Sequence, residues 1–302
     1  MKIVVAGGSG FLGRPLCQAL AGAGHQVVIL TRQPPPAARG SVSWVQWDPH
    51  GGGGPWTTAV HHADAVVNLA GESLAGRRWT GARKRRLTDS RLQPTRSLVH
   101  AMHEAPAPPD IFLSSSAVGY YGAHGDDAVT EQTPPGADFA ARLCVDWEKA
   151  AGAITSPATR VVFLRTGLVL GPGGGVLTPM LPPFKLFLGG PLGSGRQYMP
   201  WIHRADWVSL ARWILETPAV NGPVNATAPA PVTNAAFSAA LGRALHRPSW
   251  LPAPAFAIRL ALGEMATLAL NGQRALPARA TGLGFTFRFT DLDAALQDIF
   301  GG

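Results

Sequence analysis

The stretch KIVVAGGSGFLGRPLCQALAGAGHQVVILTR, residues 2–32, decides the fold. Its first five residues are a short apolar run that predicts a buried strand over 2–6. A glycine-rich turn follows, and apolar residues then recur at helical spacing until Gly24, which is placed to end a helix. The next run, residues 25–31, predicts a second strand. Strand, glycine turn, helix and strand in this order are typical of the first half of a doubly wound parallel sheet.

The glycines of this turn predict a dinucleotide site. Gly8, Gly10 and Gly13 fit the spacing G-x-G-x-x-G, and Gly7 with the last two fits the variant G-x-x-G-x-x-G. Such glycines allow a tight turn and a close approach of backbone to pyrophosphate, which then faces a helix N-terminus. The strand before and the helix after favour this interpretation over a glycine turn with a purely structural role. The residues expected to contact the cofactor here are Gly7, Gly8, Gly10, Phe11, Leu12 and Gly13.

The end of the second strand indicates which dinucleotide is bound. Sites for NAD usually place an acidic residue there for the ribose 2′-hydroxyl, whereas this chain has Thr31 followed by Arg32. A guanidinium can pair with a 2′-phosphate through two hydrogen bonds. We therefore predict that NADP(H) is the cofactor, with Thr31 and Arg32 in contact with it. The alternative is a solvated arginine at a strand end.

The rest of the first half continues the alternation. We expect strands within 63–71, 111–122 and 159–171, alternating with helices over 80–104 and 138–152. This order predicts an α/β fold, a Rossmann-type doubly wound parallel sheet with helices on both faces.

The pattern of residue types along the sequence changes after residue 170. Proline and glycine mix with short apolar pieces, a helix is expected over 201–215, and FTFRF at 285–289 predicts a short strand. Two regions follow: a dinucleotide-binding Rossmann domain over 1–170, and a smaller C-terminal α/β lobe on the substrate side over 171–302, with some segments returning to the first domain. Residues 33–56 are expected to be mostly loop.

Composition narrows the class of protein. The chain has 302 residues, of which 46% are hydrophobic and 15% charged, so it is globular. Cys17 and Cys144 are too few for a disulfide framework, and no metal-ligand spacing is present. The start carries no signal-peptide pattern, and the longest apolar stretch, 251–270, contains Arg259 and Glu264, which indicates a packed helix. We expect a cytoplasmic monomer or homodimer with no membrane partner.

The net charge of +8 is concentrated between residues 77 and 96. Aromatic residues do not alternate with these basic ones as they do in proteins that bind single-stranded nucleic acid. We therefore interpret most of the cluster as a solvated helix face, expect no nucleic-acid partner, and expect a small-molecule substrate for which the charge allows an anionic form.

The chain resembles the extended short-chain dehydrogenase/reductase superfamily, and within it the "epimerase family" of sugar-nucleotide-epimerase-like, NADP-binding proteins. The resemblance spans essentially the whole chain. The segments that carry it are GGSGFLG, LTR, VVNLAGE, RRWT, SSSAVGYYG, DFAARLCVDWE, RTGLVLGPGGG, GGPLGSGRQYMPWIH, VNATAP and GQRALP. It implies that Leu69 and Ala70 lie over the nicotinamide half, that Val169 lines the nicotinamide pocket, and that Arg91 and Arg86 reach cofactor phosphate or substrate.

The resemblance also implies a catalytic Ser with a Tyr-x-x-x-Lys pair, and here the chain departs from it. Ser116 matches the serine, but Cys144 stands at the tyrosine position and Glu148 at the lysine position. A carboxylate four residues from a thiol raises the thiol pKa and so disfavours the thiolate. The usual relay is absent, and we predict Ser116 with Tyr121 or Tyr120 as the catalytic residues.

Four other side chains are weaker substitutes, and each has a structural interpretation. His203 can orient a strand–helix junction, and Glu72 can cap a helix or pair with an arginine. The remaining two are Lys185 and Glu131. Two functions therefore stay open: an NADP(H)-dependent oxidoreductase or epimerase-like enzyme acting on an unknown small substrate, or an NADP(H)-binding regulatory or sensor protein with little or no turnover.

Overall fold

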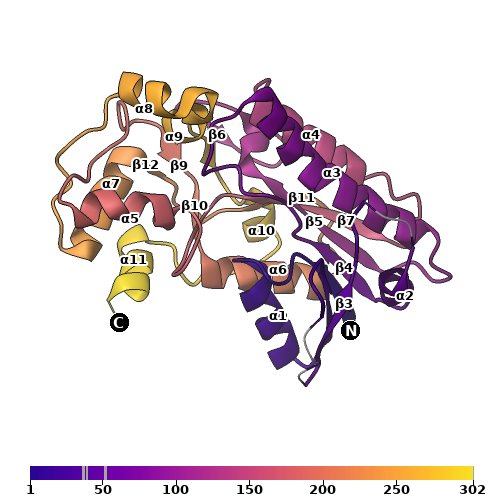
Figure 1. Ribbon diagram of the computed structural model, residues 1–302. Coiled ribbons are helices and arrows are strands. Elements are labelled where there is room, and N and C mark those ends of the chain that lie inside the picture. Colours follow the sequence, from indigo (N-terminus) through magenta and orange to yellow (C-terminus); the bar gives the residue numbers. More distant parts are fainter. Residues whose placement is uncertain (36–37, 39, 51–52, 302) are drawn as a thin grey trace.

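A seven-stranded sheet forms the body of the protein (Figure 1). The structure, a computed structural model, describes residues 1–35, 38, 40–50 and 53–301. All strands of this sheet are parallel, in the order β11-β7-β5-β4-β1-β2-β3. The strands are β1 (Lys2–Ala6), β2 (Gln26–Thr31), β3 (Val42–Gln46), β4 (Ala65–Asn68), β5 (Ile111–Ala117), β7 (Arg160–Thr166) and β11 (Gly222–Ala226). The predicted Rossmann-type sheet is confirmed.

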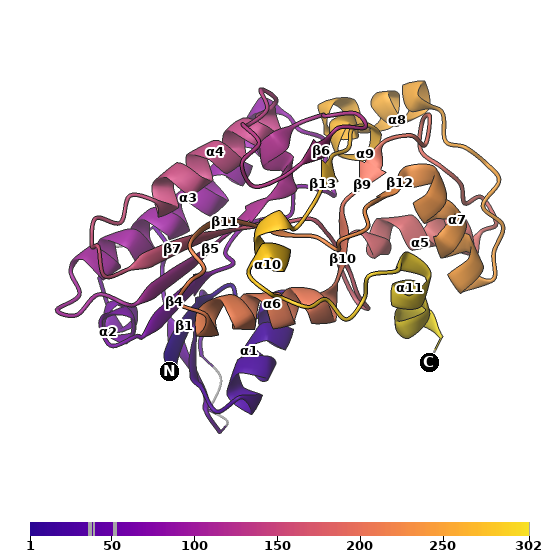
Figure 2. The ribbon, with the colours of Figure 1, turned by 180° about the vertical axis from the view of Figure 1, so that it is seen from behind.

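Helices cover both faces of the sheet, as Figures 1 and 2 show from opposite sides. One face carries α1 (Gly13–Gly22) and α6 (Arg204–Glu216). The other carries α2 (Pro55–His61), α3 (Gly81–His103) and α4 (Phe139–Ala151). Because both faces are covered, the central strands are apolar nearly throughout, and every residue of β4 is buried.

Side-chain caps form the N-terminal ends of the two helices expected over 80–104 and 138–152. The hydroxyl of Thr80 accepts a hydrogen bond from the amide of Arg83 at the start of α3, which continues through Pro94. At the start of α4, the carboxylate of Asp138 accepts one from the amide of Ala141 at 2.9 Å. These caps fix where α3 and α4 begin, and α4 carries Cys144 and Glu148.

Most of the chain after residue 170 forms a smaller lobe beside the sheet (Figures 1 and 2). It has its own apolar core, centred on Trp201 and Phe237. Its helices are α5 (Leu177–Lys185), α7 (Asn234–Leu245), α8 (Ala255–Leu262), η2 (Gly263–Ala266), α9 (Thr267–Leu270) and α11 (Leu292–Phe300). Its strand pairs are β8 (Leu168–Leu170) with β10 (Trp201–His203), and β9 (Tyr198–Met199) with β12 (Val232–Thr233).

A few short elements join the two parts. They are η1 (Val118–Tyr121), β6 (Ala128–Val129), β13 (Arg274–Ala275) and α10 (Ala278–Gly282). Helix α6 and strand β11 lie late in the chain, yet they belong to the body and extend it. None of the helices in the described part of the chain combines the length and apolar character that a membrane span requires.

Three expectations about elements are corrected. The segment 33–56 contains strand β3 and the start of α2, although its glycines and prolines suggested loop. The segment 285–289 is no strand, because the amides of Arg288 and Phe289 donate to the carboxylate of Asp206, each at 2.9 Å, instead of to a sheet ladder. Residues 251–270 are not one packed helix: α8 ends before Gly263 and has no buried residue.

Candidate functional site

The glycine turn between β1 and α1 is closed so tightly that side chains cannot enter it. Gly7 has a left-handed backbone, with φ at 81°, and its carbonyl accepts a hydrogen bond from the amide of Gly10 at 3.0 Å. A Cβ on Gly13 would lie 2.2 Å from the carbonyl oxygen of Gly7. The turn therefore requires glycine at both positions, and the backbone at its tip is left bare.

Helix α1 starts directly behind this turn, and the amide of Arg14 in its first turn donates to the carbonyl of Gly10 at 3.0 Å. Its N-cap residue is Leu12, and no side chain caps the helix. Uncapped amides at a helix N-terminus carry a partial positive charge and point away from the helix, toward the turn. Gly8 is buried against Ile29 and Cys17, so the turn packs on the sheet while Gly10 stays exposed. The arrangement can hold an anion such as a pyrophosphate.

Phe11 links this turn to the loop after β8. A Cβ on Gly174 would lie 2.4 Å from the Phe11 ring, and one on Gly175 would lie 2.6 Å from the carbonyl oxygen of Val169. The guanidinium of Arg204 lies 5.2 Å from the same ring. The predicted contact residues Phe11 and Val169 thus lie at one side of the glycine turn, although the chain between them is long.

Thr31 and Arg32 lie on the other side of the turn. Strand β2 pairs with β1, with Leu30 opposite Ala6, so the two residues leave the sheet next to the glycines. The hydroxyl of Thr31 accepts a hydrogen bond from the amide of Gln33 at 3.1 Å. Arg32 is exposed and forms no ion pair with any residue in the described part of the chain. Its guanidinium is thus available to an anionic ligand.

The turn after β4 is held from behind by α3. The side chain of Asn68 donates to Thr95 at 2.8 Å and accepts from the amide of Ala70 at 3.1 Å, which shapes the turn through Leu69. Arg91 is buried and donates to the carbonyl of Glu72 at 2.9 Å. Arg91 therefore supports this turn from the protein side.

The carboxylate of Glu72 is shared by two arginines. Arg83 lies 2.5 Å and Arg86 2.8 Å from its oxygens. The hydrogen bond from Arg83, and then the charges of both arginines, lower the pKa of Glu72 below its ordinary value. Arg86 is largely exposed at the mouth of this turn. Glu72 thus pairs with arginine, which was the structural interpretation of that residue.

A buried ionic network occupies the ends of β5, β7 and β11. Ser116, Arg165 and Asn225 stand opposite one another in the register of these three strands. Glu148 reaches down from α4 and forms a bidentate pair with Arg165, with two N–O distances of 2.8 Å. Ser116 donates its hydroxyl hydrogen to the same carboxylate at 2.6 Å. Glu148, at the position where the resemblance implies a lysine, therefore already has its partners within the protein.

Cys144, at the tyrosine position, is an inert thiol. Burial, and then the charge of Glu148, raise its pKa to about 11. The direction agrees with the sequence expectation for a thiol four residues from a carboxylate. At neutral pH the group stays protonated, so it offers no nucleophile.

The two tyrosines after β5 have different surroundings. Tyr121 is fully buried; its hydroxyl donates to Asn225 at 2.6 Å and accepts from Arg165 at 3.1 Å. Burial raises the pKa of Tyr121 to about 12, although Arg165 opposes the shift. Tyr120 is half-buried, and its ring stacks on the Arg165 guanidinium at 3.5 Å. The structure brings both tyrosines and Ser116 around Arg165.

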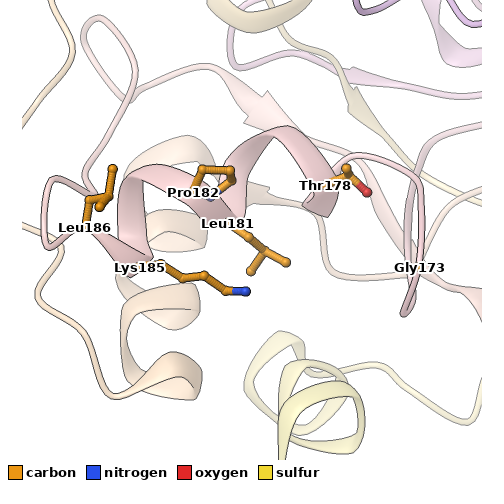
Figure 3. A pocket seen from close by; sticks show the side chains of 6 residues that line it. All are labelled: Gly173, Thr178, Leu181, Pro182, Lys185 and Leu186. Atoms are coloured by element: carbon orange, nitrogen blue, oxygen red, sulfur yellow. The ribbon is translucent and has the colours of Figure 1, made fainter.

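The other substitute residues lie apart from one another. Glu131 is buried and accepts hydrogen bonds from the amides of Asn225 and Arg279 at 3.0 and 3.2 Å. His203 caps α6 by accepting from the amide of Ala205, the junction role that the sequence favoured. Lys185 lies on α5 and lines a cavity of the lobe, shown in Figure 3.

Sequence reasoning missed Arg165 and Asn225 as members of the site. The signal for Arg165 was present: an arginine stands within the otherwise apolar strand VVFLRTGLVL, and a glutamate at a buried helix position needs a cation. Asn225 gave less signal, because only the strand order places it beside Arg165. Buried polar side chains in adjacent strands are easily read as surface residues when the pairing is unknown.

These features define a Rossmann-type nucleotide-binding protein. The family model for the NAD-dependent epimerase/dehydratase family matches residues 3–226, and a domain of unknown function, DUF1731, matches residues 253–299. The chain belongs to the NAD-dependent epimerase/dehydratase family.

Relatives match over the full length. The epimerase family protein MT2273 of Mycobacterium tuberculosis is 44% identical over 299 residues, which cover 97% of this chain and 96% of that protein. The crystal structure of human epimerase family protein SDR39U1 with NADPH is 35% identical, covers 100% of both chains and has a TM-score of 0.89. The UDP-glucuronic acid 4-epimerase of Bacillus cereus, at 17% identity, a TM-score of 0.79 and coverage of 100% and 98%, shares the fold.

Proposed function

We propose that this chain binds NADP(H) across the β1–α1 glycine turn and is an oxidoreductase-like member of its family. One observation carries the proposal: Gly7 and Gly13 leave a bare turn in front of the uncapped amides of α1. That cradle suits a pyrophosphate and leaves no room for a side chain. The full-length similarity to a protein crystallised with NADPH supports the same cofactor.

Residues around the turn would hold the rest of the cofactor. We assign the 2′-phosphate to exposed Arg32, beside Thr31, because a guanidinium suits a phosphate dianion. The backbone at Leu69 and Ala70, with Val169 opposite, would border the nicotinamide half. Arg86 is exposed enough to reach a phosphate, whereas Arg91 would act by holding the turn between Ala70 and Glu72.

A reduced nicotinamide supplies hydride when it is bound, and the chain would then position a small substrate. The Ser116 hydroxyl already donates a hydrogen bond to Glu148, so toward a substrate its oxygen can only accept one. Tyr121 is occupied by Asn225 and Arg165. The proton donor we propose is therefore Tyr120, whose ring rests on Arg165. The net charge of +8 favours an anionic substrate.

A screen of NADPH oxidation against carbonyl compounds, with small anionic ones included, tests this activity. We expect turnover of at least one compound, a fall of about tenfold or more in kcat for Tyr120→Phe, and a comparable fall for Ser116→Ala. If Tyr120→Phe and Ser116→Ala both leave every activity intact, the assignment of these residues is wrong.

A second function is favoured by the buried network itself. Ser116, Glu148 and Arg165 satisfy one another inside the protein, an arrangement that suits a rigid binding protein as well as an enzyme. In that case the chain binds NADPH and reports its presence without transferring hydride. The same screen separates the two functions, because a sensor binds NADPH in a titration but oxidises it with none of the carbonyl compounds.

A further inference from the structure

The lobe carries an apolar patch at its outer end. Its members are large side chains that solvent reaches, and two of them are aromatic: Phe187 is 54% exposed and Trp250 is 66% exposed. The apolar patch comprises Leu186, Phe187, Leu188, Trp250 and Leu251. Single exposed apolar residues are ordinary in globular proteins, but five in two short segments are not.

The two segments of the apolar patch are tied together. The amide of Leu251 donates to the carbonyl of Gly189 at 3.1 Å, and a Cβ on Gly190 would lie 2.2 Å from the carbonyl oxygen of Leu251. The guanidinium of Arg247 lies 4.7 Å from the Phe187 ring. The apolar patch is therefore one surface, built on backbone contacts that fix its two segments side by side.

The backbone presents Phe187 at some cost. Its φ of 63° lies in the left-handed region, where a bulky residue is uncommon and where glycine or asparagine is ordinary. The conformation terminates α5, because the amide of Leu188 donates to the carbonyl of Pro183 at 2.9 Å. A position where glycine is ordinary thus carries a large aromatic side chain, and solvent reaches more than half of it.

Two cationic side chains border the apolar patch. Lys185 and Arg247 are exposed beside it, and Figure 3 shows the Lys185 side chain reaching down from α5 next to Leu181. Between residues 149 and 263 the sequence contains only two carboxylate side chains, Asp206 and Glu216. Both are engaged, the first by two backbone amides and the second by His25 and Arg212.

Helix α8 extends the same character along the chain. It begins four residues after Leu251 and has no buried residue, and Phe256 and Leu260 lie one turn apart on it, both largely exposed. Arg259 stands between them in the sequence and is exposed as well. Residues 247–260 thus combine tryptophan, phenylalanine and leucine with arginine and without any acidic residue.

We propose that the apolar patch docks on an anionic lipid surface. Tryptophan and phenylalanine favour the boundary between headgroups and acyl chains, and adjacent lysine and arginine are drawn to anionic headgroups. A second copy of this chain fits less well, because a two-fold contact would put Lys185 and Arg247 of both copies into one interface in which the apolar patch supplies no carboxylate. The expectation of no membrane partner rested on the lack of a signal-peptide pattern and of a spanning segment, and a docked lobe needs neither.

Sedimentation of the full chain with vesicles tests this inference. We expect binding to vesicles of phosphatidylcholine with about one third phosphatidylglycerol, and much weaker binding to phosphatidylcholine alone. In about 1 M salt, where the screening length falls to about 3 Å, the preference for anionic vesicles is lost. Changing Lys185 and Arg247 to Gln lowers the partition coefficient by about fivefold for each charge.

The decisive variant removes the two aromatic side chains. Phe187→Asn combined with Trp250→Ser lowers the partition coefficient by about tenfold or more, and asparagine suits the left-handed backbone, so folding is preserved. Leu283→Ser is the matched control, since Leu283 is an exposed leucine outside the apolar patch, and it leaves binding unchanged. Absent binding to anionic vesicles, or equal loss in the control, overturns the proposal. So does a wild-type dimer that the double variant converts to monomer, because a second copy then covers the surface.

Discussion

At two places along the carboxyl end of the same sheet, the polar groups differ in exposure and in hydrogen bonding. At the end of β1 and β2, the glycine turn leaves the amides of α1 uncapped and the guanidinium of Arg32 exposed. At the end of β5, β7 and β11, Ser116, Glu148 and Arg165 are buried and bonded to one another. The polar groups of the first place are available to a ligand, whereas those of the second are already hydrogen-bonded to one another inside the protein.

The difference separates binding from chemistry. Groups that are unpaired in the free protein gain hydrogen bonds when a ligand arrives, whereas groups that are already paired must lose theirs first. The family's tyrosine and lysine would be available to a substrate, but a buried bidentate ion pair is not a proton relay. Cofactor binding therefore follows directly from the glycine turn, and turnover depends on the few groups, such as Tyr120, that the network leaves free.

Breaking the buried network is expected to have the largest effect. Arg165→Met leaves Glu148 buried without its cation, and we expect a loss of about 3–5 kcal/mol in the free energy of unfolding, measured by urea denaturation. Arg165→Met combined with Glu148→Met restores most of it, because no charge is left unpaired. Arg212→Met is the control: its pair with Glu216 is exposed, so about 0.5 kcal/mol or less is lost. If the double variant is as unstable as Arg165→Met, the ion pair does not explain the loss.

Closing the glycine turn comes next in size. In Gly13→Ala the added Cβ meets the carbonyl oxygen of Gly7, at 2.2 Å in the unrelaxed structure, so the turn must open. We expect the affinity for NADPH, measured by calorimetry, to fall by about a hundredfold, which corresponds to about 2.7 kcal/mol. Gly22→Ala, on the same helix, meets nothing within 4 Å and leaves the affinity unchanged. Equal affinities in the two variants would contradict the claim that the glycine turn holds the pyrophosphate of NADPH.

The stability of the protein at alkaline pH tests the burial of the Cys144 thiol. The pKa of Cys144 rises from 9.0 to about 11 on folding, so between these values the unfolded chain loses a proton that the folded protein keeps. Stability therefore falls as pH rises through this window, by up to about 1.4 kcal/mol per pH unit for this thiol. Cys144→Ala should show a shallower decline between pH 9 and 11. Identical slopes for the two proteins would mean that the thiol titrates normally.

Removing the charge of Arg32 is expected to have the smallest effect. Arg32→Gln keeps a hydrogen-bond donor but loses the ion pair with a 2′-phosphate, so we expect NADPH to bind about tenfold more weakly and NADH to bind as before. The ratio of the two dissociation constants is the quantity to measure. A parallel loss for both cofactors would place Arg32 outside the 2′-phosphate site.

The glycine turn could be predicted from the sequence, whereas the buried network of Ser116, Glu148 and Arg165 could be predicted only in part. The glycine turn is local: its strand, glycines and helix are neighbours in the chain, so spacing alone identifies it. The direction of the Cys144 pKa shift also agreed with a local relation, the four-residue spacing to Glu148, although burial in the fold is its larger cause. The pairing of Glu148 with Arg165 and of Tyr121 with Asn225 joins α4, η1, β7 and β11, and only the folded sheet brings these together.

The lobe shows a second limit of sequence reasoning. Residues 251–270 were expected to be a packed helix because they are apolar, yet α8 is exposed and Gly263 ends it. Composition does not tell whether an apolar segment packs on its own chain or faces outward. The segment 285–289 has the alternation of a strand, but the carboxylate of Asp206, far away in the sequence, takes two of its amides.

A calorimetric titration of the unmodified protein with NADPH and with NADH tests the central claim most directly. The claim is that the open side of the sheet end binds NADP(H) through the glycine turn, with Arg32 at the 2′-phosphate. The account predicts saturable binding of one NADPH per chain, about tenfold or more tighter than NADH. Equal affinity for the two cofactors, tighter binding of NADH, or no binding of either would contradict it.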